Sequence, residues 1–479
     1  MLVDSSHRKA HRRWRVPTRI CRTTIAIQLL LLVTVSLVVC GLLEASDAGV
    51  SLLTMSGQKV LDVHTDPDPG AQESPGHTPS KPKIHKYKYT TLPGYFLQDD
   101  PKTRPEEFEF MKTNFGLVQR SYDSDENLPN KGRDMTAWQR FENHITTLNR
   151  AEERKRHGSE EGGHTQYKLI FLGRHGNGYH NIAERYYGRE AWDCHYSALD
   201  GDPENVMVWS DAHLSKEGRR QAAEVNDFWK ARIKDGKMSL PQTYFVSPLD
   251  RAMETAQITF KGLLDKFDPT VMERLREGTG IHTCDRRSGV SYIRDRYPDF
   301  ITTRDPLLTE LDEFWDPDLR EPEDALATRL GKLFDQLMRS EGFRDSERIS
   351  FTSHSGAIGA ILRVLGHRPF SLGTGAVIPV FIKIEREELE EKRHGGKAEG
   401  GKHAKVGDDD GELDGQENDG LADTMAVNKS KWGRIPSCPA DMDLKTVGQK
   451  RWKMDLKEFV TGVENGTVQI EEVAFREAH

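Results

Sequence analysis

Residues 167–181 read YKLIFLGRHGNGYHN, a short apolar run followed at once by an arginine, a histidine and two glycines. An apolar run of this length, bounded by polar residues, is typical of a buried β-strand. Arg174 and His175 stand where this strand ends, and burying unpaired charge is costly. The stretch therefore predicts either an anionic partner for these two side chains or an open site at the end of the strand.

The strand predicted at Lys168–Gly173 belongs to a series in which strand-like and helix-like segments alternate. The further strands are predicted at Thr243–Val246, Arg348–Thr352 and Ala376–Ile384, and the helices at Lys216–Lys234, Leu249–Leu264, Glu321–Arg339 and Ala357–Leu365. Alternation of this kind predicts an α/β fold with a mainly parallel sheet. Helices should cover both faces of the sheet, as a three-layer α/β/α sandwich.

The N-terminal region differs from the rest of the chain in charge and hydropathy. Residues 1–22 are rich in arginine and hold one acidic residue, Asp4, whereas Thr23–Leu43 holds no charged residue. An uncharged apolar run of about 20 residues can cross a bilayer as a helix. The positive-inside rule then places the N-terminus in the cytoplasm and the remainder in a lumenal or extracellular space. We expect a single-pass signal anchor, with a cleaved signal peptide of a secreted protein or a mitochondrial presequence as alternatives.

Composition divides the chain beyond this apolar run. Residues 44–85 are polar and rich in proline and glycine, which predicts a disordered stalk. The α/β pattern occupies residues 86–385. Residues 386–430 carry mixed and then acidic charge, which predicts a disordered insertion. Tryptophans and other apolar residues in 431–479 predict that the C-terminal segment packs back on the domain.

Net charge and cysteine content indicate which ligands and covalent links to expect. The formal net charge of −8 gives no sign of nucleic-acid binding. Three of the five cysteines, Cys194, Cys284 and Cys438, lie beyond the apolar run, and no C-x-x-C pattern is present. We expect no cofactor and no metal, and one disulfide could join two of these three cysteines if the domain is lumenal.

Unusual side chains follow three of the predicted strands. The first strand ends in Arg174-His175-Gly176, the second runs into Ser247-Pro-Leu-Asp-Arg251, and a later one ends in Ser353-His354-Ser355. In open α/β sheets, ligands bind outside the carboxyl ends of the strands. The two arginines and two histidines therefore predict a positively charged pocket for a phosphoryl group.

The order of these motifs resembles that of the histidine phosphatase superfamily, also called the phosphoglycerate mutase-like family. R-H-G, then S-P-L-x-R-A-x-x-T-A, then a strand ending in S-H-S-G match over roughly residues 87–385. Residues 211–222 are similar to the family's L-T-x-x-G-x-x-Q-A helix. The stretch Leu275–Asp285 resembles the fungal phosphomutase-like branch most.

The resemblance implies a role for each motif residue. His175 would attack phosphorus and form a phosphohistidine intermediate. Arg174 and Arg251 would hold the non-bridging oxygens, and a protonated His354 would add a further donor. Asn181 stands where phosphoglycerate mutases place an asparagine that contacts phosphate, although it could instead cap the following helix.

Two carboxylates compete for the role of general acid, which must protonate the leaving alcohol. Glu277, in Leu-Arg-Glu, resembles the family's acid position and is favoured, and Glu310 is the rival. His282, Cys284 and Asp285 hint at metal ligands, but three mixed residues in one loop are more often structural.

Departures from the family pattern bear on the reaction. Asn177 follows R-H-G where phosphoglycerate mutases usually carry Glu, which weakens a mutase assignment. Gly178 and His180 do not fit the R-H-G-x-R-x-P of the acid phosphatase and phytase branch. We therefore expect a phosphomonoester hydrolase that acts on a small phosphorylated molecule or a phosphoprotein. A phosphomutase and an inactive, membrane-tethered binding protein on the same fold stay open as alternatives.

Overall fold

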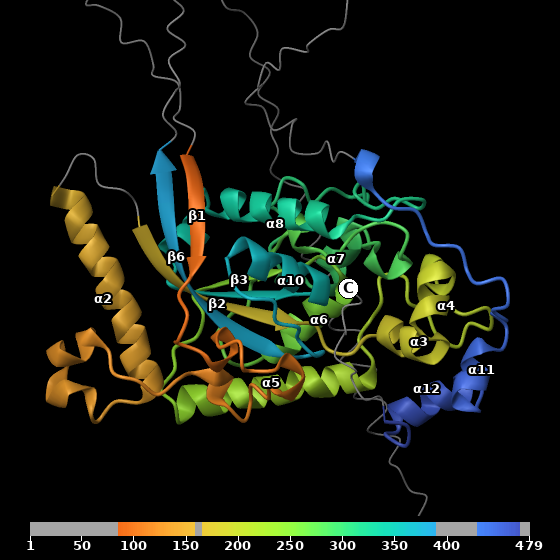
Figure 1. Cartoon of the computed structure of the whole chain (residues 1–479), viewed down its shortest axis with the longest axis horizontal. Helices are drawn as coiled ribbons and strands as arrows, with labels where there is room; N and C mark the ends of the chain where they lie inside the picture. The colour runs from red at the N-terminus through yellow and green to blue at the C-terminus, as the bar shows by residue number, and fades with distance from the viewer. Residues whose placement is uncertain (1–84, 159–164, 389–428, 470–479) are drawn as a thin grey trace, which may run out of the picture. The chain divides into compact units, whose positions relative to one another are not determined.

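The computed structural model describes residues 85–158, 165–388 and 429–469 (Figure 1). The expected signal anchor at Thr23–Leu43 lies outside these residues, as do nearly all of the expected stalk and most of the insertion. Within the described ranges, no helix is long and apolar enough to cross a bilayer.

A six-stranded sheet forms the centre of the domain, with the strand order β1-β6-β2-β5-β3-β4. The strands are β1 (His85–Thr91), β2 (Thr165–Arg174), β3 (Thr243–Val246), β4 (Thr270–Val271), β5 (Arg348–Ser353) and β6 (Val377–Glu388). Strands β2, β5, β3 and β4 run parallel to one another, whereas β6 is antiparallel to both β2 and β1. The prediction of an α/β fold with a mainly parallel sheet is confirmed.

Helices lie on both sides of this sheet (Figure 1). They are α2 (Ala137–Gly158), α3 (Tyr179–Tyr187), α4 (Arg189–Cys194), α5 (Lys216–Lys234), α6 (Asp250–Thr259), α7 (Val290–Arg296), α8 (Glu323–Leu337), α9 (Glu341–Asp345), α10 (Ser355–Val364), α11 (Val447–Trp452) and α12 (Leu456–Glu464).

The side chains of β2 show how the layers are held together. Successive residues of a strand point to opposite faces of its sheet. Ile170 and Leu172 belong to the apolar core formed with α8 and α10. Leu169 and Phe171 belong to a second core, formed with α2 and α5. Because β2 is apolar at every position from 169 to 172, it is buried on both faces, as the uninterrupted apolar run predicts.

Several elements differ from the predicted ones. Strand β6 is antiparallel and continues to Glu388, so residues 386–388, predicted as part of the insertion, belong to the sheet. Helix α6 ends at Thr259 rather than at Leu264, and Gly262 in the following turn has a φ of +70°. A left-handed residue of this kind interrupts a helix. Strand β1 and the long helix α2 have no counterpart among the predicted elements.

The C-terminal segment, residues 429–469, packs on helices α3 and α4, with α11 and α12 beside them (Figure 1). Phe459 is fully buried in an apolar cluster with Ile182 and Tyr186 of α3. A disulfide between Cys194 at the end of α4 and Cys438 joins the segment covalently to the domain. The third cysteine, Cys284, is buried and stays a free thiol.

Candidate active site

The carboxyl ends of β2, β5 and β3 bring the predicted site residues to one edge of the sheet. In the β2–β5 register, Arg174 lies opposite Ser353, and the backbone N–H of His175 donates to the carbonyl of Ser353 at 3.0 Å. Ser247 follows β3, and its backbone N–H donates to the carbonyl of Thr352 at 3.1 Å. Three strands that are far apart in sequence thus place His175, Ser247 and His354 together.

His175 is 2% exposed, and its ring orientation is fixed by a hydrogen bond. Its Nδ1 lies 2.7 Å from the carbonyl oxygen of Gly176. Since a carbonyl oxygen can only accept, Nδ1 carries the proton and Nε2 keeps its lone pair. Burial, and then the nearby Arg251 and Arg174, hold the pKa of His175 well below its ordinary value. The ring is therefore neutral, with an unprotonated Nε2 that can act as a nucleophile.

The two arginines are held by groups from distant loops. Arg251, 1% exposed, donates from Nη1 to the carbonyl of Cys284 at 2.6 Å and from Nη2 to Oδ1 of Asp285 at 2.8 Å. Arg174 donates from Nη1 to the carbonyl of Leu372 at 2.6 Å. These contacts hold both guanidinium groups in place, and the fork of donors of a guanidinium suits phosphoryl oxygens.

His354 is fully buried at the N-terminus of α10, and its ring centroid lies 5.1 Å from that of His175. Its Nε2 is 2.7 Å from Oγ of Ser247. Burial, and then Arg251, lower the pKa of His354 well below its ordinary value. The surroundings of the ring therefore favour its neutral form, in contrast to the protonated form expected from the resemblance. A bound phosphoryl dianion would oppose this shift.

The two candidate acids both accept hydrogen bonds at a helix N-terminus, but at different helices. Glu277 accepts from the backbone N–H of Gly356 at 2.9 Å and from that of Ala357 at 3.0 Å, directly after His354. Glu310 accepts from the backbone N–H of Ser291 at 3.0 Å, in the first turn of α7. Hydrogen bonds from Ser291 lower the pKa of the exposed Glu310, which is unfavourable for an acid.

The loop after His175 is packed against the start of α5. A Cβ at Gly176 would lie 2.4 Å from the carbonyl oxygen of Gly218, so this glycine is needed for close contact between two backbone segments. The backbone N–H of Gly176 donates to Oγ1 of Thr255 at 2.9 Å. Asn181 accepts from the backbone N–H of Gly178 at 3.0 Å and so caps the first turn of α3.

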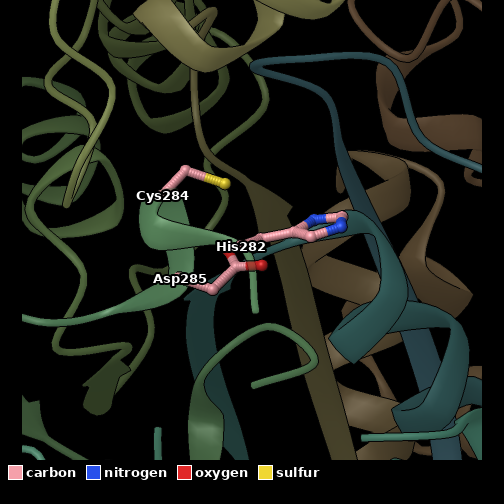
Figure 2. Close-up of side chains that lie close together, drawn as sticks. All are labelled: His282, Cys284 and Asp285. Carbon is pink, nitrogen blue, oxygen red and sulfur yellow. The ribbon is translucent and has the colours of Figure 1, made fainter. Parts of the chain in front are cut away.

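His282, Cys284 and Asp285 project toward the same side of one loop, and their potential ligand atoms lie within 4.8 Å of one another (Figure 2). Their environment does not suit a cation. Both carboxylate oxygens of Asp285 accept from arginines, Oδ1 from Arg251 and Oδ2 from Arg320, each at 2.8 Å. Burial raises the pKa of the Cys284 thiol well above its ordinary value, which disfavours the thiolate that metals require. The loop therefore serves to hold Arg251.

Some residues of this region were not among the predicted site residues. Ser247, Thr255, Asp285 and Arg320 support the predicted residues, and His180 lies in the site itself, with its ring centroid 5.3 Å from that of His175. Ser247 and Thr255 do lie in the S-P-L-x-R-A-x-x-T-A motif. Asp285 pairs with Arg251, which is 34 positions away in the sequence, and with Arg320, which is 35 positions away. The sequence carries no local signal for these two ion pairs.

Several known proteins are similar to this chain in sequence. Residues 202–377 match the profile of the histidine phosphatase superfamily (branch 1). The chain is 44% identical over 301 residues to a "Probable phosphoglycerate mutase" of Arthroderma benhamiae, covering 62% of this chain and 84% of the relative. It is 36% identical over 219 residues to "Phosphomutase-like protein 3" of Candida albicans, covering 46% of this chain and 66% of that protein.

Among solved structures, phosphoglycerate mutase from Bacillus anthracis is similar at 16% identity and a TM-score of 0.29, over 45% of this chain and 88% of that one. The stretch that the family profile matches contains Arg251, Glu277 and His354, whereas the R-H-G motif of β2 precedes it and lies at the same sheet edge. On the strength of the family profile and the Arthroderma relative, the chain belongs to the histidine phosphatase superfamily.

Proposed function

We propose that this protein is a phosphomonoester hydrolase that works through a phosphohistidine intermediate at Nε2 of His175. The observation that carries the proposal is the 2.7 Å hydrogen bond between Nδ1 of His175 and the carbonyl of Gly176. It fixes the tautomer that leaves Nε2 as the nucleophile, in a buried site where Arg174, Arg251 and His354 are close by.

In the first step, the Nε2 lone pair of His175 forms a bond to phosphorus while the ester P–O bond breaks. The leaving oxygen takes a proton from Glu277, and Arg174 and Arg251 balance the charge on the non-bridging oxygens. In the second step, a water molecule attacks phosphorus, the P–N bond breaks, and the carboxylate of Glu277 accepts a proton from that water. Inorganic phosphate leaves and the neutral His175 is restored.

Glu277 supports this scheme better than Glu310 through its position. It binds the first amides of α10, the helix that begins directly after His354. Glu310 binds the first turn of another helix and is exposed to solvent. The carboxyl that moves protons should lie beside the histidines that surround the phosphoryl group.

The substrate class we propose is a small phosphorylated molecule, with a phosphoprotein as the alternative. A phosphomutase reaction is the second candidate, because two fungal relatives are named for that activity. Asn177, in place of the mutases' usual glutamate, favours the hydrolase. The disulfide between Cys194 and Cys438 supports a lumenal or extracellular domain, because such bonds persist in oxidising compartments. Attachment to a membrane through Thr23–Leu43 stays a prediction.

The test is phosphate release by the purified full-length chain from a panel of phosphomonoesters, with His175→Ala as the inactive comparison. His144→Ala is the matched control. His144 lies in α2 and contacts Tyr95, and neither residue is assigned to the site. We expect release by the wild type and the control, and a phosphoprotein on rapid quench that is labile to acid. No release from any ester and no labile phosphoprotein would contradict the hydrolase. Transfer between positions of one substrate without release would establish the mutase.

A further inference from the structure

His180 is a third histidine beside the nucleophile. It is the second residue of α3, and the loop from Gly176 to Gly178 separates it from His175. Its side chain is 9% exposed, and its ring centroid lies 5.3 Å from that of His175, nearly the same separation as the 5.1 Å between His175 and His354. The nucleophile therefore has two imidazole neighbours, which come from two different elements, and the catalytic scheme above gives His180 no role.

One nitrogen of the His180 ring makes no hydrogen bond to the described residues. Nδ1 of His180 is fully buried and has no hydrogen-bond partner within the described ranges of the chain. Buried polar side-chain atoms are almost always hydrogen-bonded, so an exception calls for a functional explanation. His354 shows the same feature, since its Nδ1 is also buried without a partner in the described part of the chain. Both rings flank the residue that would carry the phosphoryl group.

The local backbone is built around the His180 ring. A Cβ at Gly178 would lie 2.7 Å from Nδ1 of His180 and 2.8 Å from its Cε1, so any larger residue at 178 would displace the imidazole. Asn181 caps the same turn through the backbone N–H of Gly178. The start of α3, and with it the position of His180, is therefore fixed relative to the loop from Gly176 to Gly178.

The charges around the ring suit an anionic ligand. Burial, and then Arg251, His175 and Arg174, lower the pKa of His180 well below its ordinary value. The ring is thus neutral, with one N–H to donate, and the cationic Arg251 and Arg174 are near it. A neutral donor among arginines is complementary to a group that carries negative charge on several oxygens.

We propose that His180 is a further catalytic residue, which donates an imidazole N–H hydrogen bond to a non-bridging oxygen of the phosphoryl group transferred to His175. This inference rests on the proposed function. It gives the G-Y-H-N stretch after R-H-G a chemical role: the glycine makes room for the ring, the histidine contacts the phosphoryl group, and the asparagine caps the turn that holds both.

The test compares His180→Phe and His180→Asn in the full-length chain, with orthovanadate as a phosphoryl transition-state analogue. Phenylalanine keeps the ring shape without a donor, and asparagine restores an N–H. Removing one preorganised donor should lower kcat/KM and weaken vanadate inhibition by about 100-fold in His180→Phe, with partial recovery in His180→Asn. If His180 had a solely structural role, the variants would have a lower melting temperature, and vanadate inhibition would be unchanged in the fraction that stays folded. That result would overturn the proposal.

A second measurement does not depend on the folding of a variant. In the wild-type chain labelled with ¹⁵N-histidine, the His180 ring signals, assigned by their loss in His180→Asn, should shift when orthovanadate is added. No shift at saturating vanadate would overturn the contact. The inference and the proposed function fail separately. If His175→Ala stays fully active, the phosphohistidine mechanism is wrong. If His175→Ala is inactive and His180→Phe keeps wild-type kinetics and vanadate inhibition, only the role of His180 is wrong.

Discussion

Asp285 fixes the position of Arg251, because its Oδ1 accepts a hydrogen bond from Nη2 of that arginine at 2.8 Å and both side chains are almost completely buried. The other carboxylate oxygen of Asp285 accepts from Arg320 at 2.8 Å. The backbone of Arg320 in turn exchanges two hydrogen bonds, of 2.7 and 3.0 Å, with Gly433 in the C-terminal segment. A continuous series of contacts therefore joins this segment to the arginine that we expect to hold the phosphoryl group.

The first prediction is that Asp285→Asn damages both stability and catalysis. The amide has nearly the shape of the carboxylate but no charge, so two buried or partly buried arginines lose their counter-ion. Burial would raise the pKa of Asp285, but Arg320 and Arg251 outweigh it and lower this pKa to about 2, so the native group is charged. We expect a loss of about 3 kcal/mol in the free energy of unfolding and at least a tenfold fall in kcat/KM.

Urea unfolding and steady-state kinetics measure these two effects. Asp200→Asn is the matched control, because Asp200 is 65% exposed and pairs with the partly exposed Arg286. An exposed pair contributes about 1 kcal/mol or less, so this variant should stay near wild type. If Asp285→Asn were as stable and as active as Asp200→Asn, the role given to Asp285 would be wrong.

The second prediction separates the two candidate acids. Glu277→Gln should lower kcat by about 10² to 10⁴-fold on alkyl phosphates, whose leaving oxygen needs a proton. The loss should be much smaller on aryl phosphates with acidic phenols, which leave without help. Glu310→Gln removes a carboxylate that binds Ser291 and should leave kcat within about twofold of wild type on both classes.

The measurement is kcat for each variant on a series of esters with leaving groups of graded pKa. A steeper dependence on leaving-group pKa in Glu277→Gln than in wild type identifies the acid. The same steepening in Glu310→Gln, with Glu277→Gln unchanged, would reverse the assignment.

The sequence predicted those parts of the fold and site that follow from local pattern. Helix α5 has the predicted bounds, since Ser215 accepts from the backbone N–H of Gly218 and marks the first turn. Arg174, His175 and His354 lie at one sheet edge because parallel strands carry their carboxyl ends to the same side.

Features that depend on long-range contacts could not be read from the sequence. Strand β1 is found only through its antiparallel pairing with β6, nearly 300 residues later. Three cysteines allow three pairings, and only the folded chain brings Cys194 and Cys438 together. Asp285 looked like a metal-ligand candidate because its sequence neighbours are a histidine and a cysteine, whereas its partners are two distant arginines.

The third prediction concerns stability at acidic pH. His175, His180 and His354 are buried, and burial, followed by Arg251, lowers the pKa of each in the folded state. Below about pH 6.5, the unfolded chain binds a proton at each of these histidines and the folded chain does not. Each of them therefore makes the free energy of unfolding fall by about 1.4 kcal/mol per pH unit as the pH drops below that value.

Two variants whose destabilisation should change with pH in opposite directions test this linkage, by urea unfolding at pH 7.5 and 5.5. His354→Gln removes a group with a lowered pKa, so it should be less destabilising at pH 5.5 than at pH 7.5. A hydrogen bond to Asp250 raises the pKa of His213, which therefore stabilises the fold at acidic pH and loses this effect as the pH rises. His213→Gln should accordingly be more destabilising at pH 5.5. Equal pH dependence in both variants and wild type would contradict the shifts.

The fourth prediction is that the disulfide between Cys194 and Cys438 stabilises the attachment of the C-terminal segment. The bond links residues 244 positions apart, so it removes much of the conformational freedom of the unfolded chain. We expect the double variant Cys194→Ser/Cys438→Ser to lose about 2–4 kcal/mol in the free energy of unfolding. Trp452 and Phe459 also hold the segment on α3, through contacts that do not involve the disulfide. In the double variant the segment should therefore stay folded but exchange its amide hydrogens faster than in the wild type.

Urea unfolding with and without a phosphine reductant, together with hydrogen exchange over residues 429–469, measures both effects. The reductant should lower the stability of the wild type to that of the double variant and should leave the double variant unchanged. Cys284 is a buried thiol outside the disulfide, so Cys284→Ala should respond to the reductant as the wild type does. Wild-type stability that is indifferent to the reductant would show that packing alone holds the segment in place, with Cys194 and Cys438 adding nothing to it.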